Sequence, residues 1–198
     1  NYSFGDTEAL PEAGEINKAL KKLVEKYGII YVSSAGNNGP GISTNGSPGS
    51  TNSSLIGVGA YLTQPMMKAM YSAREQIPPT MFHWSSRGPA SNGYLGISIS
   101  APGAAITGVP THCLKSSELM NGTSMSSPNA TGSIACLLSA MKKQKYDISP
   151  LRVKLLLENS AKIPNDGYYS TLCMGRGILQ IDSAFNLCKH LESIPAEL

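Results

Sequence analysis

The fold of this 198-residue chain is decided by one stretch, Asn121-Gly122-Thr123-Ser124-Met125-Ser126-Ser127-Pro128. An apolar pattern at helical spacing follows it, formed by Ile134, Leu137, Leu138 and Met141. Ser124 is therefore expected at the start of a helix, where unpaired amides and the positive end of the helix dipole favour developing negative charge. This position makes Ser124 a candidate nucleophile. A serine here can equally be an ordinary helix cap, so the structural interpretation stays open.

Composition predicts one globular domain and excludes several classes of protein. Hydrophobic residues make up 41% of the chain, which is enough for a core. Lys and Arg number 16 against 13 Asp and Glu, a net charge of +3 without a long basic run, so no nucleic-acid partner is indicated. No uninterrupted apolar run reaches the length of a membrane span. The four cysteines lack the spacing of a zinc site, and their low density favours a reducing, cytoplasmic location.

Helical and strand patterns alternate along the chain. A helical stripe runs through Ile16, Ala19, Leu20, Leu23, Val24 and Tyr27. Buried strands are expected at residues 29–34, 54–58 and 96–101, and two further helices begin near Ser149-Pro150 and Asp182. The order predicts an α/β fold with a largely parallel sheet and helices on both faces. Active sites of such sheets lie beyond the carboxyl ends of the strands, where the loop after Ser34 and the start of the Ser124 helix are expected to meet.

The segment around Ser124 resembles the nucleophile segment of subtilisin-like serine peptidases, the subtilases, almost letter for letter. Upstream, Ser34-Ala35-Gly36-Asn37-Asn38-Gly39 is similar to the family's oxyanion loop. The resemblance implies that the side-chain amide of Asn37 stabilises the tetrahedral intermediate. Taken alone, Gly-Asn-Asn-Gly is an ordinary turn sequence.

Further segments match the family in order and spacing. Asn1–Gly5 is similar to the edge strand that pairs with an extended substrate, and Gly46–Gly49 resembles the far wall of the same pocket. The resemblance therefore assigns substrate binding to Ser3, Phe4, Gly5, Gly46 and Ser47. The stretches 84–89 and 100–103 match the family's scaffold, and we assign them no chemistry.

The resemblance implies a subtilisin-like fold in which residues 1–198 form a single-domain fragment, the C-terminal part of a catalytic domain. The histidine and aspartate of the family's triad are expected upstream of Asn1, so the fragment alone is expected to be inactive. His83, His112 and His190 lie outside any family-like motif, and Asp6, Asp147, Asp166 and Asp182 lie in turn or cap contexts. Acidic groups that bind a substrate amine are also expected upstream.

Ser126-Ser127-Pro128-Asn129 resembles a subgroup of large cytosolic subtilases that remove tripeptides from free N-termini and form homo-oligomers. Peptides are then the substrates, with no cofactor, metal, nucleic acid or membrane as partner. Two alternatives remain. An α/β-hydrolase would need Gly-x-Ser-x-Gly, and Ser126 breaks that pattern. A non-catalytic subtilase-fold module for assembly would not require Ser124 or Asn37.

Overall fold

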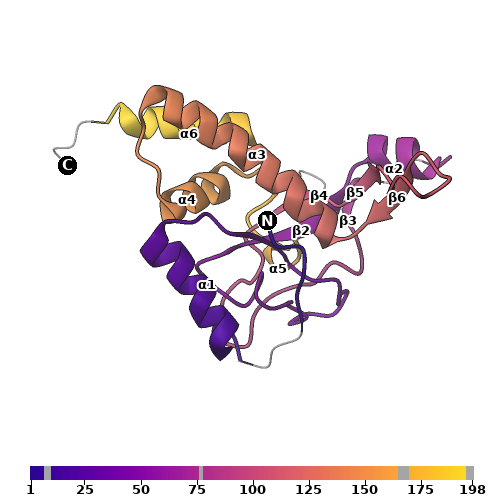
Figure 1. The fold of residues 1–198 in the computed structure, drawn as a ribbon, viewed down its shortest axis with the longest axis horizontal. Coiled ribbons are helices and arrows are strands. Elements are labelled where there is room, and N and C mark those ends of the chain that lie inside the picture. Colours follow the sequence, from indigo (N-terminus) through magenta and orange to yellow (C-terminus); the bar gives the residue numbers. More distant parts are fainter. Residues whose placement is uncertain (7–9, 76–77, 165–169, 195–198) are drawn as a thin grey trace.

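The computed structural model describes residues 1–6, 10–75, 78–164 and 170–194. Its helices are α1 (Gly14–Tyr27), α2 (Gln64–Tyr71), α3 (Thr123–Gln144), α4 (Pro150–Ser160), α5 (Thr171–Met174) and α6 (Ile181–Glu192). Its strands are β1 (Val32–Ser34), β2 (Ile56–Leu62), β3 (Thr80–Met81), β4 (Ile99–Pro102), β5 (Ala104–Thr107) and β6 (Glu118–Asn121). In Figure 1, α3 crosses the molecule from the region of α4 and α6 to an arm formed by α2, β5 and β6.

The main sheet is largely parallel, as the sequence predicts. β2 pairs in parallel with β1 on one side and with β4 on the other, so that Val58 lies opposite Ser34 and Ile99. β3 adds a short antiparallel pair at the end of β2. Tyr2 bridges to Ser33 and extends the sheet beyond β1. The N-terminal segment therefore lies at the edge of the sheet, next to the carboxyl end of β1.

Helices cover both faces of this sheet, because successive strand residues point in opposite directions. Val32, Ile56 and Val58 pack with α3 residues in the largest core cluster. On the other face, Leu55 forms a separate cluster with Leu20 and Val24 of α1. The sheet is thus a middle layer between α1 and α3, and the α/β architecture with helices on both faces is confirmed.

Several predicted elements differ in detail from the structure. α1 buries Asn17, Leu20 and Val24, whereas Ile16, Ala19 and Tyr27 of the predicted stripe are exposed. The strand expected at 29–34 is restricted to β1. Asp182 is not a helix cap, because Gln180 holds that position. The prediction for Asp166 falls outside the described residues.

The region between the second and third predicted strands contains α2, a helix that its sequence pattern did not reveal. Thr63 caps it by accepting a hydrogen bond from the Met66 amide. Met67 is buried, while Met66 and Met70 pack around the same cluster with Leu62 and Ala104. These methionines fill the core that holds the arm against the sheet.

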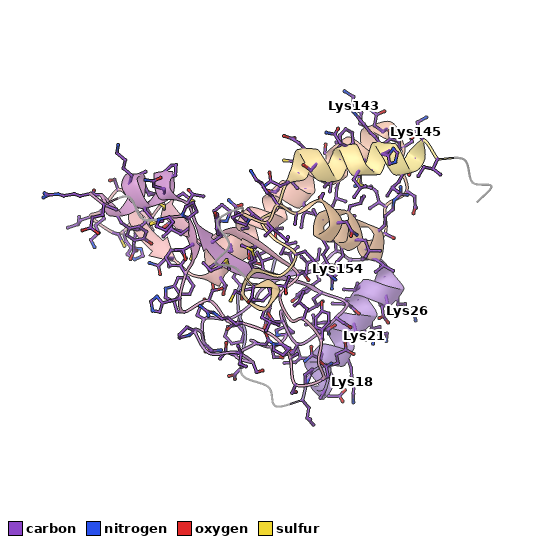
Figure 2. The ribbon with its side chains drawn as sticks, turned by 180° about the vertical axis from the view of Figure 1, so that it is seen from behind. Lys18, Lys21, Lys26, Lys143, Lys145 and Lys154 are labelled. Carbon is purple, nitrogen blue, oxygen red and sulfur yellow. The ribbon has the colours of Figure 1, made fainter. Side chains whose placement is uncertain are left out.

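α4 begins where the sequence predicts, because the Ser149 side chain accepts a hydrogen bond from the Arg152 amide. Its Lys154 is buried, unlike Lys18, Lys21 and Lys26 on α1 and Lys143 and Lys145 at the end of α3, all labelled in Figure 2. Lys154 Nζ donates to the carbonyls of Ser53 and Leu55 and to the Tyr94 hydroxyl. This lysine ties α4 to the chain that leads into β2.

The hairpin of β5 and β6 leads directly into α3. Its register places Ala104 opposite Asn121, and the Gly122 amide donates to the carbonyl of Gly103 at 2.9 Å. This pairing fixes the point at which α3 begins. Among the described residues, no helix has both the length and the apolar character needed to cross a membrane.

Candidate active site

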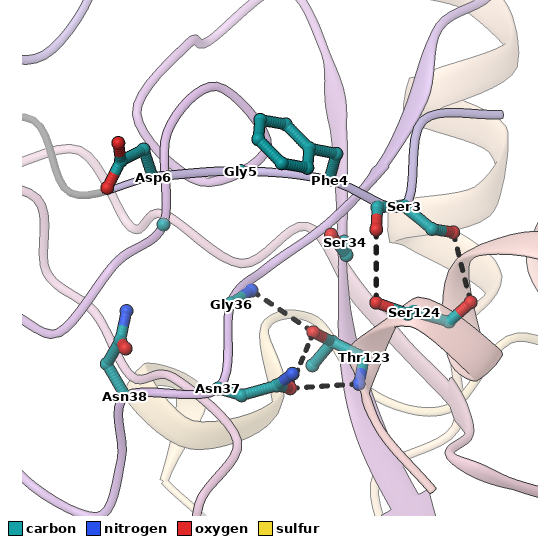
Figure 3. Close-up of a pocket in the computed structure, with 11 residues that line it drawn as sticks. Ser3, Phe4, Gly5, Asp6, Ser34, Gly36, Asn37, Asn38, Thr123 and Ser124 are labelled. Atoms are coloured by element: carbon teal, nitrogen blue, oxygen red, sulfur yellow. Dashed lines mark hydrogen bonds between the residues drawn. The ribbon is translucent and has the colours of Figure 1, made fainter. Parts of the chain in front are cut away.

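A cavity of about 300 Å³ lies where the end of β1, the start of α3 and the N-terminal segment meet. It is lined by Ser3, Phe4, Gly5, Asp6, Ser34, Gly36, Asn37, Asn38, Gly46, Thr123 and Ser124. Figure 3 shows Ser124 and Thr123 facing the loop that carries Asn37, with the segment from Ser3 to Asp6 along another side. The predicted convergence of the loop after Ser34 with the Ser124 helix is thus observed.

Ser124 is not the cap of α3. The N-cap position is held by Gly122, without a side-chain cap. The Ser124 hydroxyl instead donates to the carbonyl of Ser3 at 3.1 Å, and the Ser3 hydroxyl donates to the carbonyl of Ser124 at 3.0 Å. The capping interpretation of Ser124 is therefore wrong, and its side chain lies in the cavity beside the N-terminal segment.

The Asn37 side chain is held by its oxygen. Its Oδ1 accepts hydrogen bonds from the Thr123 amide at 3.0 Å and from the Thr123 hydroxyl at 2.8 Å. The same hydroxyl accepts from the Gly36 amide at 3.2 Å, so Thr123 closes a ring of contacts with the loop. Because Oδ1 is the acceptor in both bonds, the Nδ2 group is the part of the carboxamide left to donate elsewhere.

Two hydrogen-bond donors lie around one open position next to Gly122. A Cβ at Gly122 would stand 3.6 Å from the Ser124 amide nitrogen and 3.7 Å from Asn37 Nδ2. Within the described part of the chain, neither donor has a hydrogen-bond acceptor. Glycine at 122 keeps this space free for an atom that could accept from both donors, the arrangement needed to stabilise an oxyanion.

Most of the residues predicted from sequence line this cavity, and one does not. Ser3, Phe4, Gly5 and Gly46 are all in its wall. Ser47 instead lines a neighbouring cavity of about 230 Å³, on the side of α1. It forms the boundary between the two, because its backbone pairs with Asp6 and a Cβ at Gly5 would meet its carbonyl oxygen at 2.5 Å.

Sequence reasoning missed the position of Asp6. Its place directly after the edge segment Asn1–Gly5 could have indicated a role in the cleft, but it was assigned to a turn or cap. Asp6 is exposed and lines the cavity. Among the described residues in the cavity wall, it is the one with an ionisable side chain. A carboxylate at this position provides a binding partner for a positively charged group.

No histidine lines the cavity. His83, His112 and His190 all belong to the described residues, and each is exposed on another part of the molecule. In the parts of the chain that the structure describes, no group of three or more His, Cys, Asp or Glu residues is arranged to hold a metal ion. The cavity therefore contains a hydroxyl and two amide donors without an imidazole beside them.

Comparisons with known proteins agree with this geometry. Residues 1–179 match the subtilase family, so the chain belongs to that family. It is 45% identical to tripeptidyl-peptidase 2 of Oryza sativa subsp. japonica over 196 residues. A crystal structure of tripeptidyl peptidase 2 superposes with a TM-score of 0.73 at 33% identity and covers 96% of this chain. The self-cleaved protease domain of PatA superposes with a TM-score of 0.69 at 25% identity and covers 95% of this chain.

The aligned region is a small part of the larger relatives. It spans 98% of this chain but 14% of the rice protein, and likewise 14% of the crystallised tripeptidyl peptidase 2. For the PatA protease domain the aligned share is 60%. The fold is shared with the two solved structures, and the activity of a whole relative does not follow for this chain from these matches.

Proposed function

We propose that this chain is the C-terminal part of a subtilase catalytic domain and carries the nucleophile Ser124 and the oxyanion donor Asn37 of a serine peptidase. The observation that carries the proposal is the single cavity lined by the Ser124 hydroxyl and the Asn37 loop. The open position at Gly122, within reach of Asn37 Nδ2 and the Ser124 amide, supports it further.

The proposed chemistry is acyl transfer. Ser124 Oγ attacks the scissile carbonyl carbon, and the carbonyl oxygen becomes negatively charged and accepts hydrogen bonds from Asn37 Nδ2 and the Ser124 amide. The acyl-enzyme is then hydrolysed by water. Attack requires a base to take the Ser124 proton, because a serine hydroxyl is a weak nucleophile at neutral pH.

The substrate is proposed to be an extended peptide that binds along Ser3, Phe4 and Gly5, with one of the peptide's side chains pointing toward Gly46. Ser47 contributes by shaping the wall, not by lining the cavity. The similarity to tripeptidyl-peptidase 2 supports an exopeptidase that releases tripeptides from free N-termini. Such an enzyme must bind the substrate's ammonium group, and Asp6 provides one carboxylate for that purpose within this chain.

The chain alone is proposed to be inactive, because the histidine and aspartate that activate the serine lie elsewhere in the parent polypeptide. All four cysteines are unpaired, which supports a reducing, cytoplasmic location. A homo-oligomeric parent is proposed from the resemblance to the large cytosolic subtilases. The alternative is a non-catalytic assembly module. It gives no reason for two donors without acceptors, Asn37 Nδ2 and the Ser124 amide, at one open position.

A fluorophosphonate that labels active serines tests the proposal. We expect stoichiometric labelling of Ser124 in the parent polypeptide, loss of labelling in Ser124→Ala, and no rapid labelling of the 198-residue chain. Ser126→Ala is the matched control, because the buried Ser126 hydroxyl donates to the carbonyl of Gly122 inside the helix. Labelling of the parent that persists in Ser124→Ala would rule the proposal out, and rapid labelling of the isolated chain would show that a base exists within it.

A further inference from the structure

Ser86 contacts the Asn37 loop on both sides of Asn37. Its backbone amide donates to the carbonyl of Gly36 at 2.9 Å, and its hydroxyl oxygen accepts from the amide of Asn38 at 3.1 Å. Ser86 is fully buried, whereas its partners Gly36 and Asn38 are half-buried and exposed. The two peptide groups that flank the Asn37 Cα are thereby fixed to one residue from a distant segment of the chain.

The loop is shaped to allow this contact. Gly36 has a φ of 103°, in the region that favours glycine, and a Cβ there would stand 2.7 Å from Ser86 Oγ. Three residues further along the loop, the Gly39 amide donates to the carbonyl of Trp84 at 2.8 Å. The segment 84–86 therefore supports the loop through Trp84 and Ser86, while Thr123 holds the Asn37 oxygen.

We propose that Ser86 is a positioning residue, which keeps the Asn37 Nδ2 group directed at the oxyanion through the Gly36 and Asn38 peptide groups. The inference rests on the proposed function and adds to it a role for a segment that sequence analysis left without chemistry. Ser86 does not line the cavity and acts only through Asn37. A transition-state donor must be fixed before the reaction, since a donor that has to reorient loses much of its effect.

The neighbouring Ser85 provides a matched control. It is also buried, and its hydroxyl oxygen also accepts one backbone hydrogen bond at 3.1 Å, from the Ala60 amide of β2. Ser85→Ala removes the acceptor of the buried Ala60 amide, and Ser86→Ala removes that of the partly buried Asn38 amide, so Ser85→Ala should lower the thermal stability at least as much. Only Ser86→Ala loosens the loop that carries Asn37.

The experiment measures kcat, KM and Tm for both variants in the parent polypeptide, each with Asn37 present and in the Asn37→Ala background. We expect Ser86→Ala to lower kcat about tenfold with KM unchanged, a fraction of the loss caused by removing an oxyanion donor outright. Ser85→Ala should stay within about twofold of the unmodified enzyme. In the Asn37→Ala background the effect of Ser86→Ala should vanish, because the group that it positions is gone. If Ser86→Ala does not fold, Ser86→Cys takes its place with the same expectation.

Two results would overturn the inference: equal kcat values for the Ser85 and Ser86 variants, or a tenfold loss that persists without Asn37. Failure of the proposed function looks different. Hydrolysis would then be absent or unaffected by Ser124→Ala in the otherwise unmodified enzyme, and the role of Ser86 would fall with it.

Discussion

The hydroxyl of Ser3 donates a hydrogen bond to the carbonyl of Ser124, a bond that Pro128 cannot donate. In a regular helix the carbonyl of residue 124 would accept from the amide of residue 128, but proline has no N–H. Pro128 lies inside α3, so this carbonyl has lost its helical donor. Ser3 supplies the missing hydrogen bond and, through its own carbonyl, accepts from the Ser124 hydroxyl. The N-terminal segment and the first turn of α3 are thereby joined at the candidate nucleophile.

This relationship predicts that Ser3→Ala lowers the free energy of unfolding by about 1 kcal/mol, the usual contribution of one hydrogen bond. Pro128 is exposed, so Pro128→Ala can restore the helical donor without disturbing the core. The cost of Ser3→Ala should then be smaller in the Pro128→Ala background. Urea unfolding of the four proteins measures both differences, and equal costs in the two backgrounds would contradict this explanation.

Asp6 is predicted to determine the preference for a free amine. In the parent polypeptide, Asp6→Asn should raise KM for peptides with a free N-terminus, because the amide carries no charge to pair with the ammonium group. The preference for free over N-acetylated peptides should fall about tenfold, the size of effect of one charged contact. Asp182→Asn in the first turn of α6, far from the cavity, is the control. An unchanged preference in Asp6→Asn would exclude this role.

Lys154 is predicted to be a major stabilising residue. Lys154→Met would leave the carbonyls of Ser53 and Leu55 without their charged donor, and Leu55 is fully buried. We expect a loss of about 3 kcal/mol in the free energy of unfolding, the scale for breaking buried charged hydrogen bonds. Lys22→Met on the exposed face of α1 should change it by less than about 0.5 kcal/mol. Urea unfolding distinguishes the two, and similar small losses would show that Lys154 contributes little.

The sequence was sufficient to predict the layered α/β fold, because long apolar patterns determine it. The α3 stripe, the Ser149 cap and the alternation of helices with buried strands all had clear local causes. α2 was missed because its 8 residues are fewer than the stretch over which a helical period can be recognised. The β5–β6 hairpin was missed because β6 is exposed along its length and lacks the alternation of a half-buried strand.

The site was predictable to the extent that it depends on short motifs. Those motifs placed Ser124 and Asn37 in one cavity, but they gave no information about contacts between distant segments. Three features depend on segments that are far apart in the chain. They are the two hydrogen bonds from Thr123 to Asn37 Oδ1, the contacts of Ser86 with the Asn37 loop, and the place of Asp6 in the cavity wall. Such contacts follow from tertiary packing, which periodicity and local propensity do not encode.

The most direct test of the account is a crystal structure of the parent polypeptide after reaction with a fluorophosphonate, whose bound phosphonyl oxygen imitates the oxyanion. We expect a covalent bond from Ser124 Oγ to phosphorus, with that oxygen about 3 Å from both Asn37 Nδ2 and the Ser124 amide. The side-chain oxygen of Asn37 should keep its two hydrogen bonds to Thr123. An adduct on another serine, or a phosphonyl oxygen that faces solvent away from Asn37, would contradict the assignment of nucleophile and oxyanion donor.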